Sequence, residues 1–221
     1  MEEIRVIPLV CPSCGSDLAG PDSVRMFYCA NCCTAHDLEA GESTKVSFAD
    51  SQFLLAGDII FLPFWHFDAA IDLRSQDPKK MRELAAAPRI DRIWVAAFAM
   101  RNATVFGDPG FILTQRQTDW RPRPDGHLAG ADLSEKGAEA IARYFALSMI
   151  DKRVDITGVD AGITLTDPHL VGVPFEDAGE KLMDGLAGNS FDHRLVSDIA
   201  AIRAEFKGKK FRSVAEEKIG S

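Results

Sequence analysis

Four cysteines near the start of the chain have the spacing of a metal site. Cys11 and Cys14 form one CxxC pair, Cys29 and Cys32 form a second, and fourteen residues separate the pairs. Each pair presents two thiolates from one tight turn, so two such turns supply four soft ligands in a tetrahedral arrangement. Four thiolates leave no open position for water or substrate. The spacing therefore predicts a structural zinc ion in a zinc ribbon.

Alternatives stay open at this cluster, both for what joins the cysteines and for which residues are the ligands. A rubredoxin-like iron centre uses the same four thiolates, and a disulfide framework would join them in pairs. Cys33 follows the second pair directly and competes with Cys32 as the fourth ligand, although the matched CxxC spacing favours Cys32. His36 is close enough in sequence to be a hydrogen-bond partner of a ligand or a replacement ligand, and a surface histidine is the simpler interpretation.

The composition bounds the class of protein that carries this site. The chain has 221 residues, of which 46% are hydrophobic and 26% charged, which excludes wholly disordered, collagenous and disulfide-scaffold chains. Its first residues lack the regions of a secretory signal. The best apolar run, residues 59–67, is far shorter than the roughly 20 residues of a membrane helix. We expect a cytoplasmic protein with reduced thiols and no membrane span.

The elements that position the cysteines divide the chain into two predicted units. Residues 1–44 are expected to form the zinc ribbon, with the polar stretch 38–45 as the linker that leaves it. A segment this short buries too little apolar surface to fold alone, so the metal must stabilise it. Residues 45–221 are expected to form a β-rich domain, which makes the whole chain α+β and mostly β.

Apolar and β-branched runs predict the strands of the β-rich domain, at residues 46–48, 53–55, 59–71, 93–98, 104–106, 111–114, 154–157, 162–166 and 170–175. Segments 61–64 and 172–175 both end in Pro-Phe, so two related β units are a possible origin, with chance similarity as the simpler one. Asp-Gly and Gly-Asn pairs predict a hairpin within residues 180–191.

About three helices complete the predicted fold. Asp77 is a good N-cap residue and Pro78 suits the first helical position, so a helix is predicted to begin there and to end before Pro88. A capping box at residues 132–135 starts a second helix. An apolar face with helical spacing predicts a third over residues 195–206.

Several histidines are candidates for a second site. His66 and Asp68 lie two apart in a strand and would point to one face, where they could bind substrate or metal. The simpler interpretation is a core histidine among Phe64, Trp65 and Phe67. The pairs Asp167/His169 and Asp192/His193 resemble acid–base pairs, yet aspartate at a turn or helix start serves backbone geometry. No motif pairs a nucleophile with a base, so an enzyme with a cleft site near His66, Asp68 or His169 is an alternative only.

Basic and aromatic residues suggest two kinds of partner. Trp120 lies among Arg116, Arg121 and Arg123, an interleaving that can stack bases and hold phosphates of a single strand. Residues 1–44 carry seven acidic and two basic side chains, and a four-thiolate zinc centre would add further negative charge. The ribbon is therefore expected to meet a basic or neutral protein, and any nucleic acid would bind elsewhere. The aromatics at residues 64–67 would be the protein contact of the β-rich domain if they are exposed and not part of the core.

The layout resembles a family of bacterial zinc-ribbon proteins of uncharacterised function. The resemblance rests on CPSCG…YCANC, FLPFWHFDA, WVAAFAMRNATVFGDPGFILTQRQ and LVGVPFEDAGEKLMDGLAGNSF. It implies a cytoplasmic zinc ribbon joined to β-rich structure, with no catalytic residues to carry over, and related ribbons often dock proteins or nucleic acids. Cys33 departs from the pattern because a glycine normally follows the second CxxC. We interpret the chain as a non-enzymatic zinc-binding adaptor, with single-strand binding and catalysis as alternatives.

Overall fold

The computed structural model describes residues 9–18, 20, 24–209 and 211, and it shows a mixed α+β fold in which strand exceeds helix. The predicted fold class is confirmed. The strands are β1 (Met26–Cys29), β2 (Thr34–Asp37), β3 (Glu42–Ala49), β4 (Asp58–Arg74), β5 (Arg92–Ala96), β6 (Pro122–Arg123), β7 (Asp160–Asp177), β8 (Lys181–Asp184) and β9 (Ser190–Asp192). The helices are α1 (Pro78–Leu84), α2 (Ala103–Phe106), α3 (Pro109–Gln115), α4 (Glu135–Asp151) and α5 (Ile199–Phe206), with a 3-10 turn η1 (His193–Leu195).

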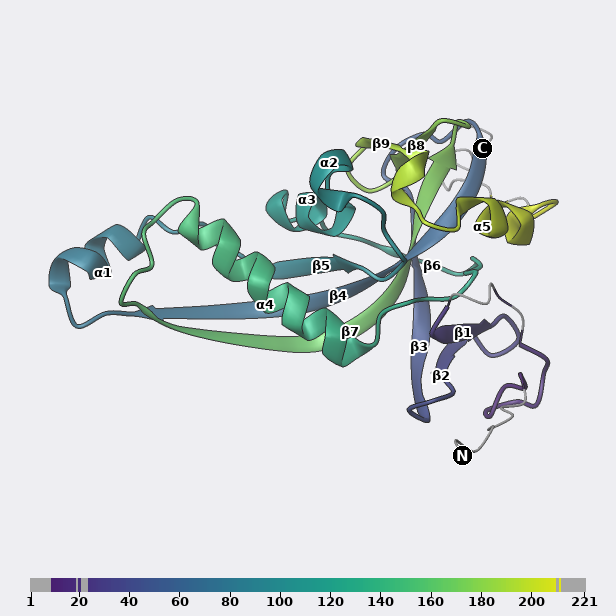
Figure 1. Ribbon diagram of the computed structural model, residues 1–221, viewed down its shortest axis with the longest axis horizontal. Coiled ribbons are helices and arrows are strands. Elements are labelled where there is room, and N and C mark those ends of the chain that lie inside the picture. Colours follow the sequence, from purple (N-terminus) through teal and green to yellow (C-terminus); the bar gives the residue numbers. More distant parts are fainter. Residues whose placement is uncertain (1–8, 19, 21–23, 210, 212–221) are drawn as a thin grey trace, which may run out of the picture.

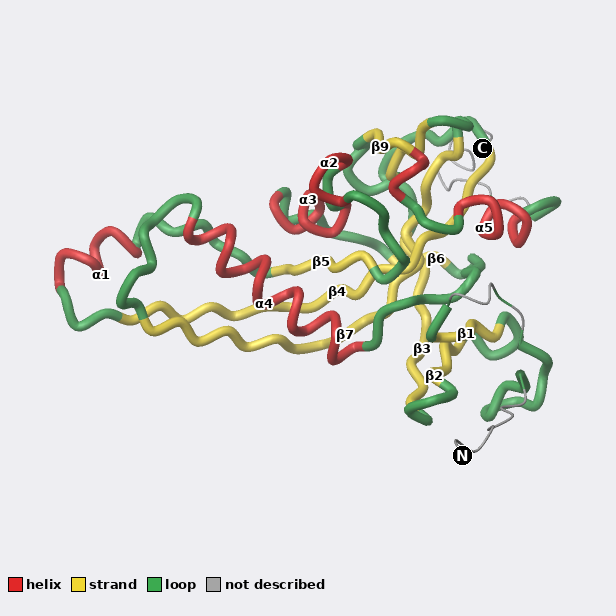
Figure 2. The backbone as a smooth tube through the Cα atoms, viewed as in Figure 1, coloured by secondary structure: helices red, strands yellow, loops and turns green. Residues whose placement is uncertain are grey.

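One sheet in the order β1-β2-β3-β7-β4-β5 runs through the molecule (Figure 1). Among the described strands in this order, β3 and β7 pair in parallel and the other neighbours are antiparallel. Strands β4 and β7 pair along nearly their whole length and project as a long two-stranded arm, with α1 at its tip (Figure 2). The near-continuous apolar run at residues 59–67 is buried on both faces, whereas residues 68–74 alternate between exposed and half-buried positions. This switch marks where the arm leaves the core.

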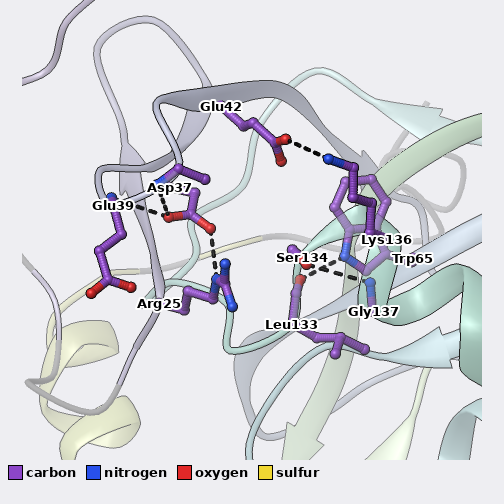
Figure 3. Close-up of polar contacts among 10 residues, drawn as sticks. Arg25, Asp37, Glu39, Glu42, Trp65, Leu133, Ser134, Lys136 and Gly137 are labelled. Atoms are coloured by element: carbon purple, nitrogen blue, oxygen red, sulfur yellow. Dashed lines mark hydrogen bonds and ion pairs between the residues drawn. The ribbon is translucent and has the colours of Figure 1, made fainter.

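Helix α4 covers one face of the arm (Figure 1). It begins at the N-cap Ser134, whose hydroxyl accepts a hydrogen bond from the backbone N–H of Gly137. The indole N–H of Trp65 donates to the carbonyl of Leu133 at 2.8 Å, which ties the helix start to β4 (Figure 3). Helix α3 packs beside β5, where Gly110 lies so close that a Cβ would stand 2.7 Å from the backbone nitrogen of Ala96.

Two predicted strands are helices in the structure. Residues 104–106 and 111–114 belong to α2 and α3. Asp108 caps α3 by accepting from the N–H of Phe111, and Pro109 occupies the first turn, so the capping residues outweighed the β-propensity of the apolar residues that follow. Residues 53–55 and 154–157, also predicted as strands, are loops and turns.

The structure also differs from the predicted boundaries of several other elements. The predicted linker 38–45 is a turn followed by the first half of β3. The capping box predicted at residues 132–135 is not the helix start, because the N-cap of α4 is Ser134 and the helix begins at Glu135. The predicted helix over residues 195–206 is divided into η1 and α5. The hairpin predicted in residues 180–191 is confirmed, because β8 and β9 pair antiparallel across it. The two Pro-Phe segments lie opposite each other in the pairing of β4 with β7.

The ribbon is joined to the β-rich part on two sides. Strand β3 pairs with β2 through its first half and with β7 through its second half. Met26 and Ala131 exchange backbone hydrogen bonds of 2.7 and 2.9 Å. Tyr28 packs edge-on against Phe48, and both belong to the main apolar core. The division into residues 1–44 and 45–221 stays a prediction, and β3 crosses its boundary.

Polar contacts support the same junction (Figure 3). Lys136 at the start of α4 reaches Glu42 of β3 at 3.3 Å across the junction, and Arg25 pairs with the buried carboxylate of Asp37 at 2.6 Å within residues 1–44. Burial alone would raise the pKa of Asp37, but hydrogen bonds from the backbone of Ala40 and from Arg25 hold that pKa below its usual range. Asp37 is therefore charged at neutral pH and fixes the turn between β2 and β3. None of the helices in the described part of the chain is long and apolar enough to cross a membrane.

Candidate metal centre

The four predicted cysteine ligands converge on one point. The Sγ atoms of Cys11, Cys14, Cys29 and Cys32 all lie within 4.8 Å of one another. Cys11 to Cys32 and Cys14 to Cys29 are both 3.6 Å between sulfurs. A tetrahedron with Zn–S bonds of about 2.3 Å has sulfur–sulfur edges of about 3.8 Å, whereas a disulfide requires about 2.05 Å. The spacing suits a metal ion held by thiolates.

Two equivalent turns present these sulfurs. Gly15, after the first CxxC, has φ +75°, and Cys33, after the second, has φ +51°. Both residues stand in the left-handed conformation with which the chain leaves each turn, which glycine adopts at no steric cost. Cys33 thus occupies a glycine position in the second turn. Its exposed sulfur lies 3.6 Å from the Tyr28 hydroxyl and outside the cysteine quartet.

His36 supports the cysteine quartet from β2. It is 1% exposed, so the interpretation as a surface histidine was wrong. Its Nε2 lies 3.1 Å from the sulfur of Cys11, and its Nδ1 lies 2.8 Å from the Ser43 hydroxyl. Burial lowers the pKa of His36, which keeps the ring neutral. A neutral ring that accepts from Ser43 can donate Nε2–H to the Cys11 thiolate.

The cysteines themselves differ in acidity in the absence of metal. Hydrogen bonds from Asn31 and Ser16 lower the pKa of Cys14 to about 5. Burial raises the pKa of Cys29 to about 12. A cation at the centre of the cysteine quartet would favour the thiolate form of all four, because metal ligation deprotonates cysteine.

Replacing His36 with phenylalanine is expected to weaken binding of Zn²⁺, the predicted metal, by about 10- to 100-fold, the usual effect of losing a hydrogen bond to a metal ligand. The ring shape is retained, while the donor to Cys11 is lost. Competition against a chelator of known affinity measures the change. His193→Phe, at a partly exposed position remote from the ribbon, is the matched control. Unchanged zinc affinity in His36→Phe would contradict the role of His36 as a hydrogen-bond donor to Cys11.

The histidine candidates of the β-rich part occupy a different place. His66 is 5% exposed and lies directly opposite His169 in the pairing of β4 with β7. Burial lowers the pKa of His66 to about 4. Asp68 is exposed, and the register of the two strands shifts between His66 and Asp68. Asp192 accepts from the N–H of Arg194, so it caps η1 as local geometry predicts.

The predicted interaction residues do not gather on one exposed surface. Phe64 and Trp65 are both 0% exposed, so the interpretation of these aromatics as a contact surface was wrong. They belong to the core because the central strand β4 has paired neighbours on both sides.

The basic residues are also separated. Arg123 is buried over the ring of Phe61 and bonded to Asp125. Arg116 is exposed and donates to the carbonyl of Ala187, and Arg121 is exposed as well. Trp120 is half-buried against the histidine pair. The described residues therefore offer no continuous platform that combines Trp120 with all three arginines.

Comparison with protein-family models, with curated proteins and with solved structures gave no match. The cysteine quartet and its surroundings therefore carry the functional argument.

Proposed function

We propose that this protein is a protein-interaction module that folds around a structural zinc ion. The observation that carries the proposal is the convergence of four cysteine sulfurs within 4.8 Å. Four protein thiolates complete a tetrahedral sphere, so the ion would hold structure rather than act on a substrate. Elemental analysis should give one zinc per chain. One iron per chain, with the visible absorption of an iron–thiolate centre, would replace zinc in the proposal.

A groove beside the cysteine quartet supports the interaction role. Its lining combines four apolar side chains with two acidic ones and with Arg25, which is paired with Asp37. Leu9, two residues before Cys11, is 49% exposed and adds apolar surface to this groove. The groove is lined by Leu9, Val24, Arg25, Phe27, Leu38, Glu39 and Asp132.

Charge points to the chemistry of the partner. Residues 1–44 have a net charge of −5, and four thiolates around Zn²⁺ would add −2. Such a surface repels phosphate and attracts cations. The partner we propose is a protein segment with an apolar anchor flanked by lysine or arginine. Nucleic acid is disfavoured at this surface for the same reason.

Affinity purification of the zinc-loaded chain from its native host tests the proposal. Leu9→Asp places a charge in the groove, whereas Val105→Asp places one at a residue of α2 that is 75% exposed. Zinc content is measured for all three baits. A partner retained by the wild-type chain and by Val105→Asp but lost with Leu9→Asp supports the proposal, and its binding should weaken as salt is raised.

The outcomes that contradict the proposal are equally specific. A partner that binds Leu9→Asp as well as it binds the wild-type chain does not use the groove. Recovery of nucleic acid in place of protein, with the steep salt dependence of phosphate contacts, would favour the single-strand alternative. Zinc loss on Leu9→Asp would show a structural defect, in which case Glu39→Lys, a charge reversal at an exposed lining residue, replaces it.

A further inference from the structure

His66 is a buried imidazole whose two ring nitrogens both lack a hydrogen-bond partner among the described residues. Its exposed fraction is 5%, so the ring is largely shielded from bulk solvent. Buried polar groups are normally paired, and leaving one unpaired costs about 1–3 kcal/mol. A histidine retained here at that cost calls for a ligand that supplies the missing contact.

A second histidine faces the first across the sheet. His66 and His169 are cross-strand neighbours on β4 and β7, so their side chains share one face. Their ring centroids lie 6.4 Å apart, and the ring of Trp120 lies 6.1 Å from His66 and 5.9 Å from His169. The His169 side chain is 39% exposed, so this histidine can turn without disturbing the core.

The environment of His169 resembles that of a metal ligand. Its Nε2 lies 3.0 Å from Oδ2 of Asp167, which leaves Nδ1 free. Histidines that bind a metal through one nitrogen usually donate the other N–H to a carboxylate, which fixes the tautomer and the ring orientation. Asp167 sits at the register shift of β7 with φ +52°, and this irregularity directs its carboxylate to His169.

We propose that His66 and His169 bind one divalent transition-metal ion at a site separate from the cysteine quartet, with Asp167 orienting His169. Imidazole is a preferred ligand of Zn²⁺, Ni²⁺ and Cu²⁺. Two imidazoles on one ion with bonds of about 2.05 Å place their nitrogens about 3.3 Å apart, so the two rings, with centroids 6.4 Å apart, must move closer when the ion binds. Water completes the coordination sphere at the exposed side.

Local charge and protonation agree with a cation at this place. Burial holds the pKa of His66 near 4, so its nitrogen lone pair is free at neutral pH. Asp68 and, more weakly, Asp119 act on His66 in the direction that favours positive charge, whereas His169 and Arg92 act against them. Arg92 is partly neutralised by Asp119, 3.8 Å away.

Titration of the tag-free, zinc-loaded full chain with Ni²⁺ tests the site. Trp94 and Trp120 lie 4.7 and 6.1 Å from His66 between ring centroids, so a paramagnetic ion bound here should quench their fluorescence. One Ni²⁺ per chain is expected, and the cysteine-bound zinc should stay in place. His169→Ala should weaken Ni²⁺ binding by at least about tenfold, since even the loss of a residue that orients a ligand has effects of that size.

Matched variants separate this site from other histidines. His193→Ala removes a partly exposed histidine elsewhere and should leave Ni²⁺ affinity unchanged. Asp167→Asn should weaken binding less than His169→Ala, because it alters orientation and not ligation. The proposal fails if the wild-type chain binds no Ni²⁺, if His169→Ala binds it as well as His193→Ala does, or if nickel uptake equals zinc release.

Discussion

Replacing Cys29 with serine is expected to abolish stoichiometric zinc binding and to unfold the ribbon. Cys29 is 1% exposed and lies 3.6 Å from the sulfur of Cys14, so its loss removes one of four ligands from a closed sphere. Binding free energy in structural zinc modules is about 10–16 kcal/mol, far more than a segment of this size gains by burial. Zinc per chain and amide hydrogen exchange in β1 and β2 are the measurements.

Cys33→Ser is the matched control for this change. Its sulfur is exposed and lies outside the cysteine quartet, so zinc stoichiometry and protection should stay as in the wild-type chain. Loss of zinc from Cys33→Ser, with retention in Cys32→Ser, would reverse the assignment of the fourth ligand. Retention of protection in β1 and β2 of zinc-free Cys29→Ser would show that the ribbon folds without metal.

The extent of unfolding after the metal is removed tests the division of the chain into two predicted units. We expect chelation to leave the rest of the chain folded, because the pairing of β4 with β7 does not pass through the ribbon. The first half of β3 should lose protection with β2, its partner, while the second half keeps its bonds to β7. A single cooperative loss of all protection would contradict the division near residue 44.

Phe64→Ala is expected to lower the free energy of unfolding by about 3–5 kcal/mol, the usual cost of truncating a buried phenylalanine. Phe64 is 0% exposed, stacks on Phe175 and meets Trp94 and Phe98 edge-on. The cavity would open at the centre of the sheet, where β4, β5 and β7 pair. Denaturant unfolding of the zinc-loaded chain measures the change.

Tyr144→Ala provides the comparison for an exposed aromatic. Tyr144 lies on α4 and is 67% exposed, so its truncation should change the free energy of unfolding by no more than about 0.5 kcal/mol. Equal effects of the two substitutions would contradict the burial of Phe64. A Phe64→Ala chain with unchanged stability and lost partner binding would restore the aromatic contact surface that the sequence suggested.

Local chemistry explains what could be predicted from the sequence. The cysteine quartet follows from the tight turns that a CxxC spacing imposes, and the β8–β9 hairpin follows from glycine beside aspartate and asparagine. Both signals act over a few residues. The caps of α1 and α3 are equally local signals. The sequence predicts only α1 as a helix, because the residues after Asp108 and Pro109 have the apolar character of a strand.

Tertiary neighbours explain what could not be predicted. Nothing in the sequence near His36 indicates that Ser43 and Cys11 enclose its ring, because Cys11 is 25 residues away. The aromatics of β4 were ambiguous because a continuous apolar run fits both a central strand and an exposed patch. The pairing of His66 with His169 depends on the register of two strands about a hundred residues apart, including the shift at Asp167.

The groove beside the cysteine quartet contains Leu9 and Phe27 from the ribbon and Asp132 from the segment before α4. Its shape therefore requires the ribbon to be folded and docked through Met26 and Ala131. Any ligand of this groove is thermodynamically linked to the metal, and the linkage is reciprocal. If the ion is zinc and a protein binds here as proposed, each would tighten the other by the same factor, and the complex should resist chelators that empty the free chain.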